Sequence, residues 1–166
     1  MAVAEIIGAA VGILLLVIVA YVIVGGTLAA GETIASAQKD LAQLTEARLR
    51  TSITLNKTET QLSGQGLNFS VTNTGNEMIA DFTHMDILIS TGGDSGGYQH
   101  LTFNSGSSTC GAVGTWCIYG DIVPDTIHPS QLDPGEKMWV WATFPAGIPE
   151  WFQVTTGNGV YAAEYV

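Results

Sequence analysis

The two cysteines of this chain are the residues whose type and spacing allow the fewest chemical roles. Cys110 and Cys117 are separated by six residues, among them Gly111 and Gly114. Two thiols at this spacing either form a disulfide that closes a small loop or contribute to a metal site. A structural zinc ion needs four ligands, and neither His nor a further Cys lies nearby in the sequence. We therefore predict a disulfide between Cys110 and Cys117, no metal site, and an oxidising exterior.

The remaining polar groups show no arrangement that catalysis requires. His84, His100 and His128 are scattered without paired spacing, and the sequence contains neither a Gly-x-Ser-x-Gly nor a His-Glu-x-x-His motif. Asp81 and Asp86 are close in sequence, but a chain rich in short strands offers many such pairs by chance. We predict no catalytic residue and no cofactor, and we expect a surface module rather than an enzyme.

Two sequons, Asn56-Lys57-Thr58 and Asn68-Phe69-Ser70, are acceptor sequences for N-glycosylation. Such triplets also occur by chance, so that occupied and unoccupied sites both stay open. Glycosylation of Asn56 or Asn68 would require this part of the chain to face the outside of the cell. That location agrees with the predicted disulfide.

The charge of the chain excludes some partners and divides the chain into two parts. Of its 166 residues 46 % are hydrophobic and 12 % are charged, and 5 Lys and Arg against 15 Asp and Glu give a net charge of −10. So acidic a chain lacks the basic surface that nucleic acid or anionic lipid requires. Residues 1–50 carry four acids and three bases, and residues 51–166 carry eleven acids and two bases, which gives −1 and −9. We predict two domains with this boundary.

The first domain is predicted to be one long apolar helix. Residues 6–30 form a stretch of 25 without a charge, and about 20 apolar residues cross the hydrocarbon core of a bilayer. The stretch is longer than the apolar region of a usual signal peptide and follows no basic segment, so we predict that it is retained. Residues 32–50 lack Gly and Pro, and their apolar residues recur at intervals of three and four. We predict a helix from about Ile6 to Arg50, roughly 65–70 Å long. A kink or short unwound stretch is expected at Gly25, Gly26 and Gly31.

Five residues of this helix are candidates for contacts with other helices: Glu5, Gly8, Gly12, Leu15 and Val19. Gly8 and Gly12 form a Gly-x-x-x-Gly pair that lets helices approach closely, although such pairs are also ordinary in membrane helices. Leu15 and Val19 belong to the apolar ridges that would pack. Glu5 is either an acid in interfacial water that the helix dipole favours, or a carboxylate that meets a cation inside an apolar assembly. Because no Lys or Arg lies within 30 residues, that cation would be an N-terminal amine of the same or a neighbouring chain.

The second domain is predicted to be an all-β immunoglobulin-like sandwich, so the fold class is α+β, with a long hydrophobic N-terminal helix before the sandwich. Short runs rich in β-branched and aromatic residues alternate with Gly, Asn, Asp, Ser and Pro. The runs are 52–56, 67–72, 85–90, 100–103, 115–119, 137–143, 151–155 and 160–165. In 137–143, Met138, Val140 and Ala142 alternate with Lys137 and two tryptophans, which another strand, a glycan or a neighbouring molecule must cover.

The long apolar N-terminal helix, Glu5 and the β-rich C-terminal domain resemble the type IV pilin superfamily, and more narrowly the archaellins and their pilin relatives. Glu5 falls on the acidic residue at mature position five of that family. The stretch Leu67-Asn68-Phe69-Ser70-Val71-Thr72-Asn73-Thr74-Gly75-Asn76 and the turn Leu132-Asp133-Pro134-Gly135-Glu136 also resemble the membrane-anchored stator proteins of the archaellum.

The resemblance implies a structural subunit of an extracellular helical filament that serves motility or adhesion. It implies a homopolymer built through the N-terminal helix, a membrane-inserted state before assembly, a leader peptidase, and a separate assembly ATPase with its membrane platform. The rival interpretation is a stator-like anchor whose sandwich binds the cell-surface layer. A third is a cell-surface enzyme or sugar-binding sandwich that uses Trp139, Trp141 and Trp151. Nucleic acid is not an expected partner.

Overall fold

The computed structural model describes residues 2–56, 61–63, 66–92, 97–106, 111–145 and 147–166. The chain forms two compact units, Met1–Leu44 and Thr45–Val166. Residues 45–50, which end the predicted first domain, therefore belong to the unit that contains the β domain.

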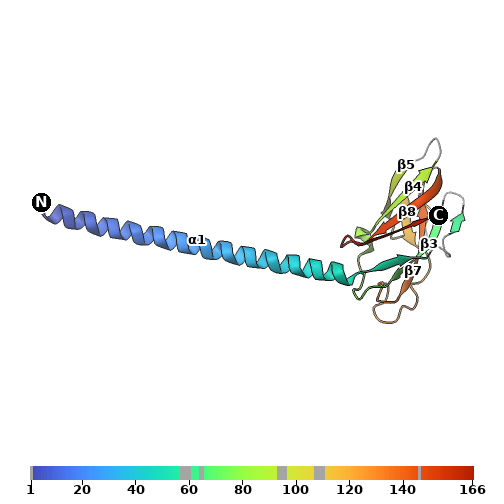
Figure 1. Ribbon diagram of the computed structural model, residues 1–166, viewed down its shortest axis with the longest axis horizontal. Coiled ribbons are helices and arrows are strands. Elements are labelled where there is room, and N and C mark those ends of the chain that lie inside the picture. Colours follow the sequence, from blue (N-terminus) through green and yellow to red (C-terminus); the bar gives the residue numbers. More distant parts are fainter. Residues whose placement is uncertain (1, 57–60, 64–65, 93–96, 107–110, 146) are drawn as a thin grey trace. The chain divides into compact units, whose positions relative to one another are not determined.

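The N-terminal helix α1 (Ala2–Arg50) contains 49 residues and is continuous (Figure 1). Its nominal length is about 73 Å at 1.5 Å per residue. The unwound stretch expected at Gly25, Gly26 and Gly31 is absent, so that expectation was wrong. The two hydroxyls of this region bond back to the helix, because Thr27 Oγ1 donates to Val24 O at 2.9 Å and Thr33 Oγ1 to Ala29 O at 3.0 Å. The helix thus satisfies its own polar groups where apolar surroundings would leave them unpaired.

Nine strands follow, and they form one continuous ladder that folds into a sandwich (Figure 1). They are β1 (Ile53–Leu55), β2 (Gln61–Ser63), β3 (Gly66–Asn73), β4 (Asp86–Gly92), β5 (Gly97–Phe103), β6 (Thr115–Ile118), β7 (Lys137–Thr143), β8 (Ile148–Thr155) and β9 (Tyr161–Tyr165). Their order is β1-β3-β7-β6-β5-β4-β8-β9, with β2 paired to β3. The β5–β6 pair is parallel and the other pairs are antiparallel. The end strands β1 and β9 lie near each other.

The core lies between a layer that contains β3 and β7 and a layer that contains β4 and β8. Phe69 of β3 and Phe152 of β8 stack across it with ring centroids 4.5 Å apart. Met138, Val140 and Ala142 are fully buried, as their alternation predicted. Each of the eight predicted strands overlaps an observed one, and β2 was not predicted. The α+β class, a long apolar helix followed by a β sandwich, is confirmed.

The two tryptophans of β7 are half-buried and are covered in part by their own domain. The Lys137 ammonium lies 5.7 Å from the ring centroid of Trp139, a cation–π distance. The Trp141 ring lies against Gly66, where an added Cβ would come within 2.3 Å of it. Trp141 also donates from Nε1 to Thr143 Oγ1 at 3.0 Å. Side chains and backbone of the same domain therefore cover part of the surface of the two tryptophans.

The end of α1 is joined to the sandwich by backbone hydrogen bonds from the turn after β3. Asn76 N–H donates to Arg50 O at 2.7 Å, and Gly75 N–H donates to Ser52 O at 3.0 Å. The first bond satisfies a carbonyl that the helix terminus leaves without an intrahelical partner, and the second holds the residues that follow the helix. Gly75 is needed for this approach, because an added Cβ would lie 2.5 Å from Arg50 O and 2.4 Å from Ser52 N.

Two buried carboxylates hold the turn between Leu132 and Glu136. Asp133 accepts a hydrogen bond from His128 N–H at 2.9 Å, and Glu136 Oε2 accepts one from Asp133 N–H at 3.0 Å. Asn73, fully buried in β3, donates to Leu132 O at 2.9 Å. Hydrogen bonds from the side chain and backbone of His128 lower the pKa of Asp133. Both buried acids therefore have hydrogen-bond partners, as their burial requires.

A third aspartate, Asp81, caps the short 3-10 helix η2 (Phe82–His84) and accepts from Thr83 N–H at 3.0 Å. Hydrogen bonds from the Thr83 hydroxyl and from His84 lower the pKa of Asp81 from 3.8 to about 2. A carboxyl whose folded-state pKa is depressed stabilises the fold above its unfolded-state pKa, and that stabilisation is lost as the pH falls toward the folded value.

We expect Gly75→Ala to destabilise the sandwich by about 1–3 kcal/mol, because the methyl group would collide with backbone atoms rather than with a movable side chain. Thermal and chemical unfolding of the full chain in detergent measures the change. Gly97→Ala is the matched control, since an added Cβ at Gly97 meets nothing within 4 Å. Equal stabilities of the two variants would contradict the close approach.

We expect the free energy of unfolding to fall as the pH is lowered from about 4 to about 2, in part because Asp81 becomes protonated. Asp81→Asn should lose less stability across that interval than the unchanged chain. Asp121→Asn is the control, because Asp121 is exposed and makes no hydrogen bond with a described residue. An identical pH slope for Asp81→Asn and the unchanged chain would show that Asp81 contributes nothing to it.

Candidate functional site

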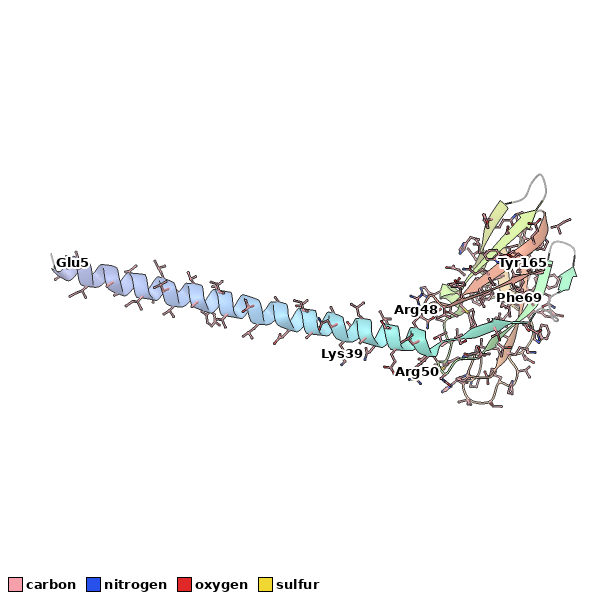
Figure 2. All side chains as sticks on the ribbon, viewed as in Figure 1. Glu5, Lys39, Arg48, Arg50, Phe69 and Tyr165 are labelled. Carbon is pink, nitrogen blue, oxygen red and sulfur yellow. The ribbon has the colours of Figure 1, made fainter. Side chains whose placement is uncertain are left out.

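The surface of α1 is the most unusual feature of the described chain. Every side chain from Val3 to Glu46 is exposed, and side chains project from the whole length of the helix (Figure 2). They include large apolar groups such as Leu16, 70 % exposed, and Ile7, 59 % exposed. Among the described helices α1 alone, from Val3 to Arg50, is long and apolar enough to cross a membrane. Apolar surface of this extent marks a contact with lipid or with protein.

The five residues predicted for helix contacts lie on one face of α1. Their spacing of three, four, three and four residues repeats along a helix face. Added Cβ atoms at Gly8 and Gly12 would meet nothing within 4 Å, so the backbone is open to a neighbour there. Leu15 and Val19 are 56 % and 53 % exposed and continue the same face. The two glycines therefore leave the backbone accessible on this face, next to the apolar side chains of Leu15 and Val19.

Glu5 lies in the first turn of α1, near its N-terminal end (Figure 2). Unsatisfied backbone N–H groups at this end carry a partial positive charge that stabilises a nearby carboxylate. Within the described chain Glu5 forms no ion pair, and the nearest Lys or Arg in the sequence is Lys39. In water the carboxylate is hydrated, but in an apolar environment it would need a cation from elsewhere.

The predicted disulfide and glycosylation sites stay predictions. Cys117 is 2 % exposed in β6, and Cys110 lies outside the described residues. Asn56 follows β1, and the other two residues of its sequon, Lys57 and Thr58, lie outside the described residues. Asn68 is half-buried in β3 opposite Trp141.

Sequence reasoning missed three Asp–His pairs. His84 Nδ1 lies 2.5 Å from Asp81 Oδ2, His100 Nε2 lies 2.7 Å from Asp86 Oδ1, and His128 Nδ1 lies 2.9 Å from Asp133 Oδ1. Only the first pair has a sequence signal, a spacing of three, because folding brings the other two together. The pairs occupy separate places, and the described residues contain no group of three or more His, Cys, Asp or Glu suited to a metal ion.

Solved structures show where this arrangement of helix and sandwich recurs. The archaeal flagellum of Methanospirillum hungatei strain JF1 matches 95 % of this chain and 90 % of its own, with a TM-score of 0.60 and 19 % identity. This chain shares its fold with a protein of an archaeal flagellum. The resemblance to archaellum proteins that the sequence indicated is thus confirmed at the level of the fold.

Two further structures of archaellum proteins match a smaller share of the chain. The archaellum periplasmic stator protein FlaG from Sulfolobus acidocaldarius covers 70 % of this chain and 99 % of its own, at 16 % identity and a TM-score of 0.48. The complex of the stator proteins FlaF and FlaG from the same organism covers 70 % and 88 %, at 18 % identity and a TM-score of 0.44. Neither a protein-family model nor a curated protein sequence matches this chain.

Proposed function

We propose that the chain is a structural subunit of an extracellular helical filament of the archaellum or type IV pilus type, which polymerises through α1 and serves motility or adhesion. One observation carries the proposal. Exposed apolar side chains continue past the uncharged stretch 6–30, at Ile34 (58 % exposed) and Leu44 (65 % exposed). A bilayer covers about 20 residues of a helix, so an anchor alone leaves these side chains in water. Packing against neighbouring copies of α1 would cover them.

The physical basis of assembly is packing rather than a gain of hydrophobicity. Before assembly lipid surrounds residues 6–30, and lipid tails are as apolar as Leu or Val. Association therefore depends on close van der Waals contact, which the open backbone at Gly8 and Gly12 permits and Leu15 and Val19 extend. A contact between two different surfaces of identical chains generates a helical polymer when the rotation between neighbours does not close a ring.

Glu5 would direct this packing. A carboxylate that leaves interfacial water for an apolar core requires a cation, and in the proposal an N-terminal amine of a neighbouring subunit supplies it. Such pairing fixes the axial register between neighbours, since any other register leaves the acid unpaired. A separate assembly ATPase and membrane platform would drive insertion, and a leader peptidase would expose the amine.

We expect Glu5→Gln to lower filament yield strongly, because the amide keeps the size of the side chain but removes its charge. Negative-stain electron microscopy of filaments shed from cells that express the variant measures the yield. Glu32→Gln is the matched control, an exposed acid of α1 outside the stretch 6–30. A normal yield for Glu5→Gln would count against ion pairing as a step of assembly.

We expect Gly12→Val to reduce filament yield as well, because the added side chain would separate two packed helices. Gly31→Val is its control: both glycines lie inside α1, and neither has an atom within 4 Å of an added Cβ. The two variants therefore alter the isolated helix alike, and only a close contact at Gly12 distinguishes them. Equal yields would refute the predicted role of the Gly8–Gly12 face.

The stator-like alternative is favoured by the single apolar helix, since one membrane span suffices for an anchor. In that case the chain stays in the membrane and the sandwich binds the cell-surface layer. Sequencing the N-terminus of the protein from cells separates the two functions, together with microscopy of shed filaments. A processed N-terminus and labelled filaments support the subunit, whereas an unprocessed chain found only in membranes supports the anchor.

A further inference from the structure

A shallow pocket of about 280 Å³ lies on the outer face of the sandwich layer that contains β4 and β8. Its lining residues are Ser90, Tyr98, Glu150, Trp151 and Tyr165. Strand register places four of them in one row across neighbouring strands, because Tyr98 pairs with Ser90, Ser90 with Trp151, and Trp151 with Tyr165. The row therefore contains three aromatic residues and a serine, and Ser90 lies between Tyr98 and Trp151.

A β-bulge adds a carboxylate to this row. Ser90 pairs with Trp151 while Thr91 pairs with Pro149, so Glu150 is an extra residue of β8 without a partner in β4. A bulge turns successive side chains toward the same face, and accordingly Glu150 and Trp151 both line the pocket. The Glu150 carboxylate lies over Gly92, where an added Cβ would come within 2.0 Å of Oε1. The backbone is therefore shaped to place an acid beside the indole ring.

The polar groups of this pocket are not used by the fold. Among the described residues, the side chains of Ser90, Tyr98, Glu150, Trp151 and Tyr165 make no hydrogen bond or ion pair with one another or with their surroundings. They offer three hydroxyls that both donate and accept, an indole N–H that donates, and a carboxylate that accepts. A ligand that satisfies them must itself carry several donors and acceptors.

The charge of this face restricts the ligand further. The next row across the same strands consists of His100, Leu88, Gln153 and Ala163, so neither row contains Lys or Arg. An anionic ligand would meet Glu150 and find no counter-charge, which excludes phosphates and acidic sugars. The volume lies near the lower limit for small-molecule pockets and suits a single ring.

We propose that this pocket binds one neutral hexopyranose residue of a glycan. A pyranose ring presents C–H groups on its faces, which pack on aromatic rings, and hydroxyls on its edges, which both donate and accept hydrogen bonds. In this assignment the ring lies against Trp151 between the tyrosines, and Glu150 and Ser90 bind its hydroxyls. Trp139 and Trp141 lie on β7 in the other layer, so the three tryptophans singled out in the sequence do not form one site.

The test is titration of the full chain, in a polyoxyethylene detergent that carries no sugar, with methyl glycosides of glucose, galactose and mannose. Saturation-transfer NMR and tryptophan fluorescence report binding. We expect saturable binding of at least one glycoside, and an affinity lower by about tenfold or more in Trp151→Ala, since aromatic anchors dominate such sites. Tyr165→Ala, at an exposed position of β9, should weaken binding even if Trp151→Ala fails to fold.

Trp139→Ala is the matched control and should bind as the unchanged chain does. Glu150→Gln should weaken glycoside binding several-fold without abolishing it, because the amide keeps one acceptor oxygen. Tetramethylammonium tests the competing chemistry, a cation in an aromatic cage. Binding of that cation without binding of any glycoside overturns the proposal, as does absence of saturable binding by all three glycosides. Neither result affects the proposed filament, because assembly rests on α1.

Discussion

The environment that α1 requires governs the rest of this molecule. Transfer of one large aliphatic side chain out of water contributes about 1.5–3 kcal/mol, and α1 exposes such side chains on all sides. The helix is therefore stable only in lipid or among other apolar helices. In the proposed assembly, lipid surrounds residues 6–30 before packing, so the choice between a membrane and a protein core would depend on close packing and on Glu5. The helix forms its own backbone hydrogen bonds along its length, which is required both in lipid and among other apolar helices.

The sandwich, unlike α1, buries large apolar side chains in a core of its own. Its core is apolar, with Phe69 and Phe152 in contact, while the residues from 51 onward contain most of the acids of the chain. Two acids, Asp133 and Glu136, are nevertheless buried, and both accept backbone hydrogen bonds within one turn. Asn73 of β3 donates to that turn, so a polar network holds this end of the domain together with the buried side chain of Leu132. The net negative charge also disfavours association between these domains, which agrees with the proposed assembly through α1.

Much of the fold was predictable because its signals are local. The long stretch without charged residues predicted α1. Short runs of β-branched and aromatic residues, separated by turn residues, predicted eight strands. Strand β2 escaped because Gln61-Leu62-Ser63 is too short for a period to show. The glycines of α1 suggested a break that the continuous helix does not have, since propensity is a weak guide when flanking turns are strongly helical. The candidate helix face followed from spacing. The bulge at Glu150 and two of the Asp–His pairs did not. The bulge and the Asp86–His100 pair depend on the register between strands, and the His128–Asp133 pair depends on how the loop between its two residues folds.

The junction after α1 has a mechanical consequence. The Arg50 carbonyl accepts a hydrogen bond from Asn76 N–H, the Arg50 guanidinium lies 3.7 Å from the Glu77 carboxylate, and Asn158 donates to the Thr51 hydroxyl. Gly75 lets the two backbones touch, and no glycine-rich linker separates Arg50 from β1. The last turn of the helix is therefore bonded directly to the domain that it enters. A twisting force on that turn would be distributed over these hydrogen bonds and would act on β1 and on the turn after β3.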